Sequence, residues 1–197
     1  MSVPPSGWLH AWEAAAGPDD PDVALVRAKA MVDLAWHQRG GGWAKHTSPH
    51  HYGAHFAALQ YWCAKWRGSE ERATAFAREA AAGAPLGSLL TALPLIAWYE
   101  HRDSDASFAD FRSPHLISLV DAALADVAAA PASNRNSAEV RHLLAYFLTR
   151  QKRYDEALAQ FRLVDGYVDA LPWRYRTDSA AFYCRWRERA ARGARRR

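Results

Sequence analysis

Residues 137–164 read SAEVRHLLAYFLTRQKRYDEALAQFRLV, and this stretch decides the fold. Its pattern predicts two helices, residues 137–150 and 154–164, joined by a short polar turn. Helices joined by so short a turn pack side by side in opposite directions. The stretch therefore predicts an antiparallel helix pair, from which the organisation of the remaining chain can be worked out.

Helical patterns also dominate the rest of the chain, and no stretch combines β-branched residues with period-two alternation between turns. Serine N-caps precede two expected helices, Ser69 before Glu70 and Ser113 before Pro114. Pro94 falls inside a strongly apolar helix, where its missing N–H predicts a kink. The further expected helices are residues 19–38, 49–67, 70–83, 86–100, 114–130 and 176–192. The sequence thus predicts an all-α fold of about eight helices, which a solenoid and a bundle both satisfy.

Length and composition indicate a globular chain with a single domain, residues 1–197. Half of the 197 residues are hydrophobic, which is enough for one sizeable core. No run approaches the roughly 18 consecutive apolar residues of a membrane helix, and the N-terminus lacks the basic region of a secretory signal. The two cysteines, Cys63 and Cys184, do not form a disulfide framework. We therefore expect a cytoplasmic protein that does not associate with a membrane.

Basic residues are concentrated at the C-terminus. Residues 174–197 contain nine arginines and two acidic residues, whereas the rest of the chain is net acidic. Arginines interleaved with aromatic residues such as Trp186 could contact a phosphate backbone and stack on bases. No nucleic-acid recognition motif accompanies them, and a solvated helix ending in a frayed basic tail, residues 190–197, accounts for the pattern. We therefore expect no nucleic-acid partner.

The predicted helix pair at residues 137–164 resembles a tetratricopeptide (TPR) repeat, a 34-residue unit whose two helices pack through large and small residues at fixed places. Arg141 occupies the position where the first helix often carries tryptophan. In such a pair a side chain larger than that of Ala157 would hold the two helix axes apart. The matching residues are Leu144, Ala145, Leu148, the run Tyr154-Asp155-Glu156-Ala157, Phe161 and Val164.

A second and weaker copy of this pattern lies earlier in the chain. Its matching residues are Ala57, Tyr61 and Ala64 in the first helix, and Ala73, Ala77, Ala80 and Pro85 in and after the second. Residues 49–95 also resemble a family of actinobacterial TPR-like proteins. The runs that carry this resemblance are His50-His51, Gly53-Ala54-His55, Gln60-Tyr61-Trp62-Cys63-Ala64-Lys65-Trp66 and Phe76-Ala77-Arg78-Glu79-Ala80. These resemblances imply a short α-solenoid of stacked helix pairs, and they imply no particular activity.

Histidines gather at the start of the expected helix at residues 49–67. His46, His50, His51 and His55 lie within ten residues, and His51 and His55 share one helical face. Two imidazoles one turn apart can chelate a transition metal, with His46 as a third ligand. Histidines that form ordinary hydrogen bonds at a helix start have the same spacing, and the His-Glu-x-x-His pattern is absent. We expect no bound metal or cofactor, and if a metal binds we expect His46, His51 and His55 to hold it.

The chain contains nine tryptophans, a large number for its length. Most are expected to fill core gaps left by the many alanines. The alternative is a groove in which tryptophans anchor a peptide or a flat ligand. Trp43, which follows three glycines, and Trp173, which follows Pro172, are expected to be exposed and are therefore the better candidates for binding.

The predicted function is that of a non-catalytic TPR-like module that binds a peptide or partner protein on a concave helical surface. Stacked helix pairs create such surfaces, which the first helix of each pair lines. Arg141 could receive a carboxylate there. The expected lining residues are Tyr52, His55, Tyr61, Trp62, Arg141 and Tyr146.

The alternative prediction is a small biosynthetic or metal-dependent enzyme with a site between helices. His50, His51 and His55 would then act as metal ligands or acid–base groups beside Tyr52. The sequence leaves open the identity of the partner, the oligomeric state and the choice between these two functions.

Overall fold

The structure is a computed structural model that describes residues 50–65, 68–102, 107–164 and 168–196. Over these residues it contains helices and no strand, which confirms the predicted all-α class. The expected helix at residues 19–38, His46 and Trp43 lie outside the described residues. The elements are α3 (Tyr52–Trp62), α4 (Glu70–Ala82), the 3₁₀ helix η1 (Leu90–Ala92), α5 (Leu93–His101), α6 (Phe108–Phe111), α7 (Pro114–Ala129), α8 (Ser137–Arg150), α9 (Tyr154–Leu163), the 3₁₀ helix η2 (Trp173–Tyr175) and α10 (Ser179–Ala194).

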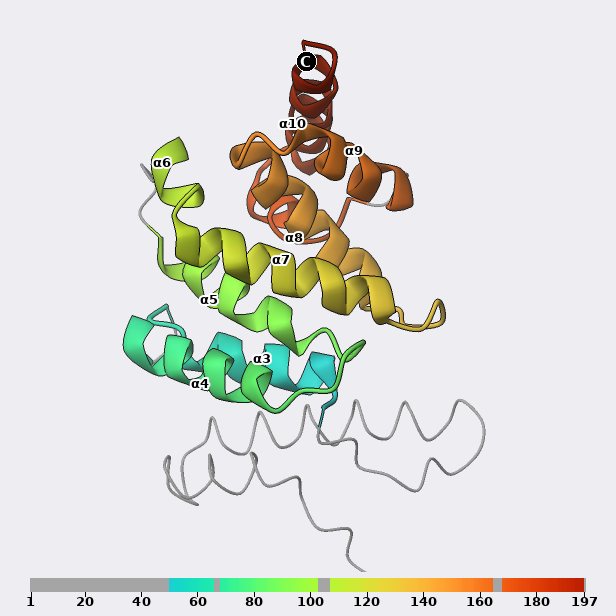
Figure 1. The fold of residues 1–197 in the computed structure, drawn as a ribbon. Coiled ribbons are helices and arrows are strands. Elements are labelled where there is room, and N and C mark those ends of the chain that lie inside the picture. Colours follow the sequence, from blue (N-terminus) through green and yellow to red (C-terminus); the bar gives the residue numbers. More distant parts are fainter. Residues whose placement is uncertain (1–49, 66–67, 103–106, 165–167, 197) are drawn as a thin grey trace, which may run out of the picture.

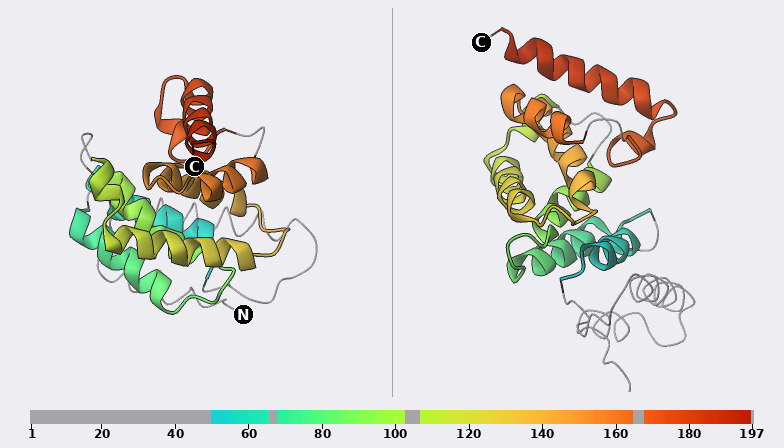
Figure 2. Two further views of the ribbon diagram at one scale, coloured as in Figure 1. Left: turned by 45° about the horizontal axis from the view of Figure 1, so that its top comes forward. Right: turned by 90° about the vertical axis from the view of Figure 1, so that its right-hand side faces the viewer.

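The described helices pack on one another in chain order and form a layered stack (Figure 1). α3 and α4 form the layer at one end, α5 and α7 the next, and α8 and α9 the third. α10 lies across α9 at the opposite end, as the side view in Figure 2 also shows. α4 and α3 contact α5, α7 contacts α8, and α9 and α8 contact α10, and these contacts join each layer to the next.

The helix pair predicted at residues 137–164 forms as α8 and α9, and both Ala145 and Ala157 are fully buried in it. The turn between the helices is a Schellman motif, in which the N–H of Arg153 donates to the Leu148 carbonyl oxygen at 2.9 Å. The N–H of Lys152 donates to the Thr149 carbonyl oxygen at 3.2 Å. Lys152 therefore takes the left-handed conformation usually adopted by glycine, with φ 63°.

A buried carboxylate ties α7 to the connection between α4 and α5. Asp126 is 1 % exposed, and its two oxygens accept hydrogen bonds at 2.6 Å from the N–H of Gly87 and from the Thr91 hydroxyl. Gly87 has φ +90°, and a Cβ there would lie 3.0 Å from the Ala129 carbonyl oxygen, so the turn needs glycine. Asp126 thereby satisfies the backbone of an irregular segment that no helix ladder can satisfy.

Two sequence expectations are corrected by the structure. Pro94 does not kink a helix, because η1 precedes it and α5 begins at Leu93, which places the proline in the first turn where no intrahelical N–H bond is lost. Trp173 is not exposed: its side chain is fully buried, and its indole N–H donates to His142 Nδ1 at 3.0 Å. α10 also continues to Ala194, two residues beyond the expected end.

Replacing Ala157 with leucine is expected to lower the free energy of unfolding by about 1–3 kcal/mol, because the added methyl groups must fit where α9 packs against the core. Ala159 lies on the exposed side of the same helix, so Ala159→Leu is the matched control and should change stability by less than about 0.5 kcal/mol. Urea unfolding followed by circular dichroism measures both variants. Equal stability of the two would contradict the close packing at Ala157.

Replacing Lys152 with glycine is expected to raise the free energy of unfolding by up to about 1 kcal/mol, because glycine adopts a positive φ without the clash that a Cβ causes. Lys152→Ala also removes the long side chain but keeps the Cβ, so it should bring no such gain. The same urea experiment compares the two variants, and a gain with alanine as large as with glycine would show that the side chain and not the backbone is responsible.

Candidate functional site: a groove between α9 and α10

The predicted histidine cluster lies at the start of α3. His51 is the N-cap of this helix, and its Nδ1 accepts a hydrogen bond from the Ala54 N–H at 3.1 Å. Nδ1 of His55 lies 3.1 Å from the His51 carbonyl oxygen, and burial lowers the pKa of His55. Among the described residues no three His, Cys, Asp or Glu side chains are arranged to hold a metal, and His46 is not among them. The contacts present thus explain both histidines as supports of the helix start.

Three of the six residues expected to line a concave surface are buried. Tyr52 and Tyr146 are each 4 % exposed and His55 is 5 % exposed, so these side chains offer no open surface to a partner. Tyr146 is covered by Trp173 and Trp186, whose rings lie 5.9 and 4.8 Å from its own. The rings of Tyr52 and Tyr146 belong to the hydrophobic core instead.

The other three expected residues are partly exposed. Arg141 donates to Gln160 Oε1 at 2.8 Å and to the Val127 carbonyl oxygen at 3.2 Å, so its guanidinium links α7, α8 and α9. Tyr61 and Trp62 lie at the end of α3 with their rings edge to face at 5.5 Å. These two rings belong to α3 and Arg141 belongs to α8, so they lie in different layers of the stack. A role of these residues in binding stays a prediction.

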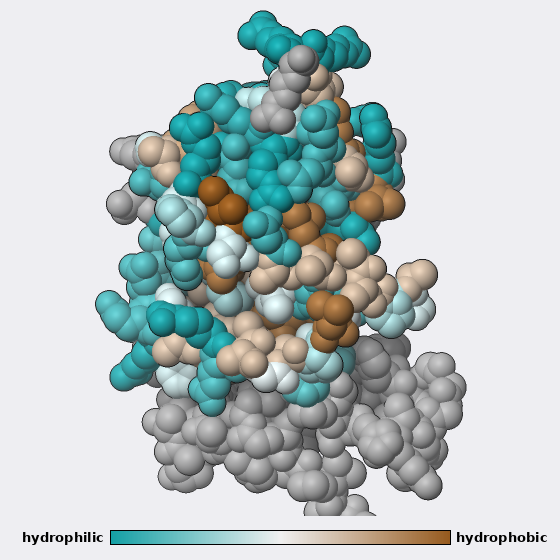
Figure 3. All heavy atoms as spheres, viewed as in Figure 1, coloured by the Kyte–Doolittle hydropathy of each residue, from teal (hydrophilic) through white to brown (hydrophobic). Residues whose placement is uncertain are grey.

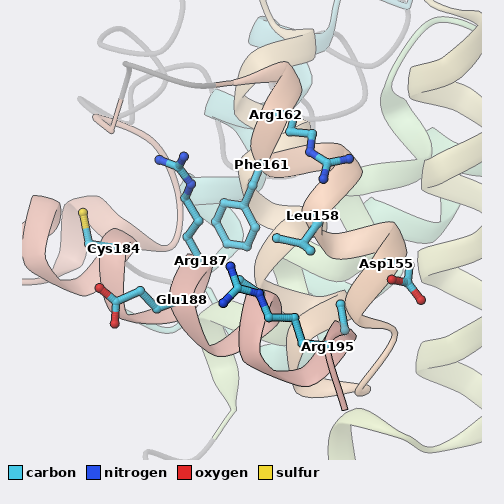
Figure 4. A pocket seen from close by; sticks show the side chains of 10 residues that line it. Asp155, Leu158, Phe161, Arg162, Cys184, Arg187, Glu188 and Arg195 are labelled. Carbon is cyan, nitrogen blue, oxygen red and sulfur yellow. The ribbon is translucent and has the colours of Figure 1, made fainter. Parts of the chain in front are cut away.

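A groove of about 670 Å³ lies between α9 and α10 (Figure 4). Its accessible apolar lining is the half-buried Leu158 of α9 together with Ala191 and Ala194 of α10, whereas Phe161, which also borders the groove, is buried in the core. The two helices run in opposite directions, because the end of α10 packs against the start of α9. There a Cβ on Gly193 would lie 2.3 Å from a ring carbon of Tyr154, so only glycine allows this approach.

Arginines from both walls line the groove: Arg162 comes from α9, and Arg187 and Arg195 come from α10. In Figure 4 they lie around Leu158 and Phe161, while the two acidic lining residues, Asp155 and Glu188, lie at opposite margins. Glu188 Oε2 is 4.0 Å from Arg192 Nη1, so a cation outside the groove offsets part of its charge. Four further exposed arginines of this helix region are Arg185, Arg189, Arg192 and Arg196.

This end of the molecule is therefore hydrophilic and positively charged, and Figure 3 shows hydrophilic residues covering much of it. Exposed single ion pairs contribute little, but several arginines together create a positive potential over the groove. Guanidinium groups bind carboxylates through two parallel hydrogen bonds, and the apolar lining can bury a hydrophobic side chain. The groove is chemically suited to a segment that is both acidic and apolar.

A second hollow, of about 820 Å³, brings His50, His51 and Tyr52 next to the turns at residues 85–88 and 131–136. Two of its polar side chains already accept hydrogen bonds from nearby backbone N–H groups. Asn134 Oδ1 accepts from the Asn136 N–H and His51 Nδ1 accepts from the Ala54 N–H, each at 3.1 Å. The predicted enzyme residues therefore share one hollow except for His55, which is not among its lining residues. Catalysis by them stays a prediction.

The α9/α10 groove was not predicted from the sequence, because the arginines of residues 174–197 have the pattern of a solvated helix. One signal was available. Cys184, Arg187, Ala191 and Ala194 recur at spacings of three and four, which places one arginine and three small residues along one side of a charged helix. Leu158 and Arg162 carry no comparable signal, since only the fold places them opposite that side.

Comparisons of this chain with protein-family models, with curated proteins and with solved structures found no match. None of the described helices is long and apolar enough to cross a membrane.

Cys184 is expected to react with a thiol reagent in the folded protein, whereas Cys63 is not. Burial raises the pKa of the Cys63 thiol to about 11, so at about pH 8 only about one molecule in a thousand carries the reactive thiolate. Cys184 lines the groove and is exposed. Titration with Ellman's reagent should detect one fast thiol per chain, and the second only after unfolding in guanidinium chloride. Cys184→Ser should abolish the fast reaction, and a fast reaction in that variant would contradict the burial of Cys63.

Proposed function

We propose that this chain is a TPR-like interaction module that binds a segment of a partner protein. The packing of described helices in chain order supports a short α-solenoid, because in such folds each helix pair contacts mainly its neighbours. The TPR-like pattern of α8 and α9 and the burial of Ala157 support it further. Both cysteines are free thiols, which fits a reducing compartment such as the cytoplasm.

The surface that we propose for binding is the α9/α10 groove. The observation that carries this proposal is the combination of an apolar lining with arginines on both walls. Arginine is enriched in protein interfaces, and apolar surface surrounded by charge gains most from being covered. The concave surface first expected at Tyr52, His55 and Tyr146 offers no such combination, because these side chains are already packed.

Selection from a library of random peptides against the full chain is expected to yield binders that depend on the groove. Arg162→Glu and Arg195→Glu should each weaken the affinity of such binders about tenfold or more, since reversing one charge at an interface replaces attraction by repulsion. Fluorescence anisotropy of labelled peptides measures the dissociation constants.

Arg185→Glu provides the matched control, because Arg185 is exposed on the same helix and does not line the groove. It carries the same change of charge and should alter affinity less than about threefold, through the long-range potential alone. Binders whose affinity falls equally in all three variants, or a selection that yields none, would overturn the proposal.

A further inference from the structure

One side of α10 has no helical neighbour among the described residues. α10 contacts α8, α9 and η2 through its buried side, which carries Tyr183, Trp186 and Ala190. Its groove side, with Cys184, Ala191 and Ala194, is open. Near the end of α10 the small residues Ala191 and Ala194 allow another helix axis to approach to about 8–10 Å, while Arg187 and Glu188 line the groove between them and Cys184.

The walls of the groove favour a helical occupant over an extended one. Both walls are α-helices, so their backbone N–H and C=O groups already pair within each helix. An extended segment would find no sheet edge there, and its own backbone groups would lose water without a protein partner. A helix satisfies its backbone internally and presents only side chains, which is what this groove can bind.

The size of the groove sets the length and pattern of that helix. α9 has 10 residues and is therefore about 15 Å long, which matches about three turns of an occupant. Apolar side chains at positions i, i+3, i+4 and i+7 would follow the accessible lining of Leu158, Ala191 and Ala194. Acidic side chains flanking this stripe would meet Arg162 on one wall and Arg187 and Arg195 on the other.

We infer that the groove binds an acidic amphipathic helix of a partner protein, which lies along α10. This inference rests on the proposed function and specifies the partner for the same site. The α10 helix of a second copy does not fit the site, because its exposed surface carries six arginines and one glutamate between residues 185 and 196 and would bring like charges together.

The test uses the full chain and three designed peptides of one length. The first has a leucine stripe flanked by glutamates and a hydrocarbon staple on its outer side, which holds it helical. The second has the same composition with two prolines in the middle, which prevent a helix. The third is the stapled helix with lysine in place of each glutamate. Fluorescence anisotropy should show binding of the first at least tenfold tighter than of either other peptide, and weakening as salt is added.

Variants of the chain link that binding to the groove. Ala191→Trp fills the open side of α10 and should reduce affinity for the stapled peptide about tenfold, whereas Arg185→Glu should reduce it less than about threefold. Circular dichroism confirms that each variant is folded. A nitroxide on one end of the stapled peptide should broaden amide signals near Cys184, and one on its other end those near Ala194, because the bound helix lies along α10.

The outcomes separate this inference from the proposed function. If the proline peptide binds as tightly as the stapled helix and both need the groove, the helical partner is wrong and the interaction module stands. If no designed peptide binds but the library selection yields groove-dependent peptides that are not acidic amphipathic helices, the inferred partner is again wrong and the interaction module stands. If neither experiment yields a groove-dependent binder, both proposals fail.

Discussion

The hydrogen bond from the indole of Trp173 to His142 holds together the part of the structure that forms the candidate site. Trp173 is fully buried, and its N–H donates to Nδ1 of His142 at 3.0 Å. The same ring contacts Tyr146 of α8, Phe161 of α9 and Tyr183 of α10 at centroid distances of 5.9, 6.1 and 5.5 Å. One side chain from a connecting segment thus fixes three helices relative to one another.

The groove depends on this contact because its two walls come from different parts of the chain. The chain between α9 and α10 contains Trp173. The packing of Trp173 therefore sets where α10 lies relative to α9. A buried indole without an acceptor would cost about 1–3 kcal/mol, which His142 prevents. Asp126 plays a comparable part at the other end of the stack, where it satisfies the backbone of Gly87 and Thr91. In both places a single polar group makes an irregular segment compatible with burial.

Local sequence signals predicted most of the described helices, though not α6, because the physical causes of helix ends are themselves local. Ser69 and Ser113 cap α4 and α7 through hydrogen bonds to residues three positions on, and such contacts can be expected from the sequence alone. The burial of Trp173 could not be predicted in this way. Its neighbours Tyr146 and Phe161 are 27 and 12 residues distant in sequence, so only the tertiary arrangement decides whether a residue after Pro172 faces water.

The candidate site was harder to predict than the fold for the same reason. A charged helix with small residues on one side can be a solvated surface helix or one wall of a binding groove. Which of the two it is depends on the residues that the fold places opposite that side. The positive charge of the end of α10 has two consequences that act together. Like charges on Arg162 and Arg195 oppose closure of the groove and self-association through it, and the same charges raise the local concentration of acidic segments. The arginines that keep the apolar lining hydrated would therefore also favour the acidic partner that we propose to cover it.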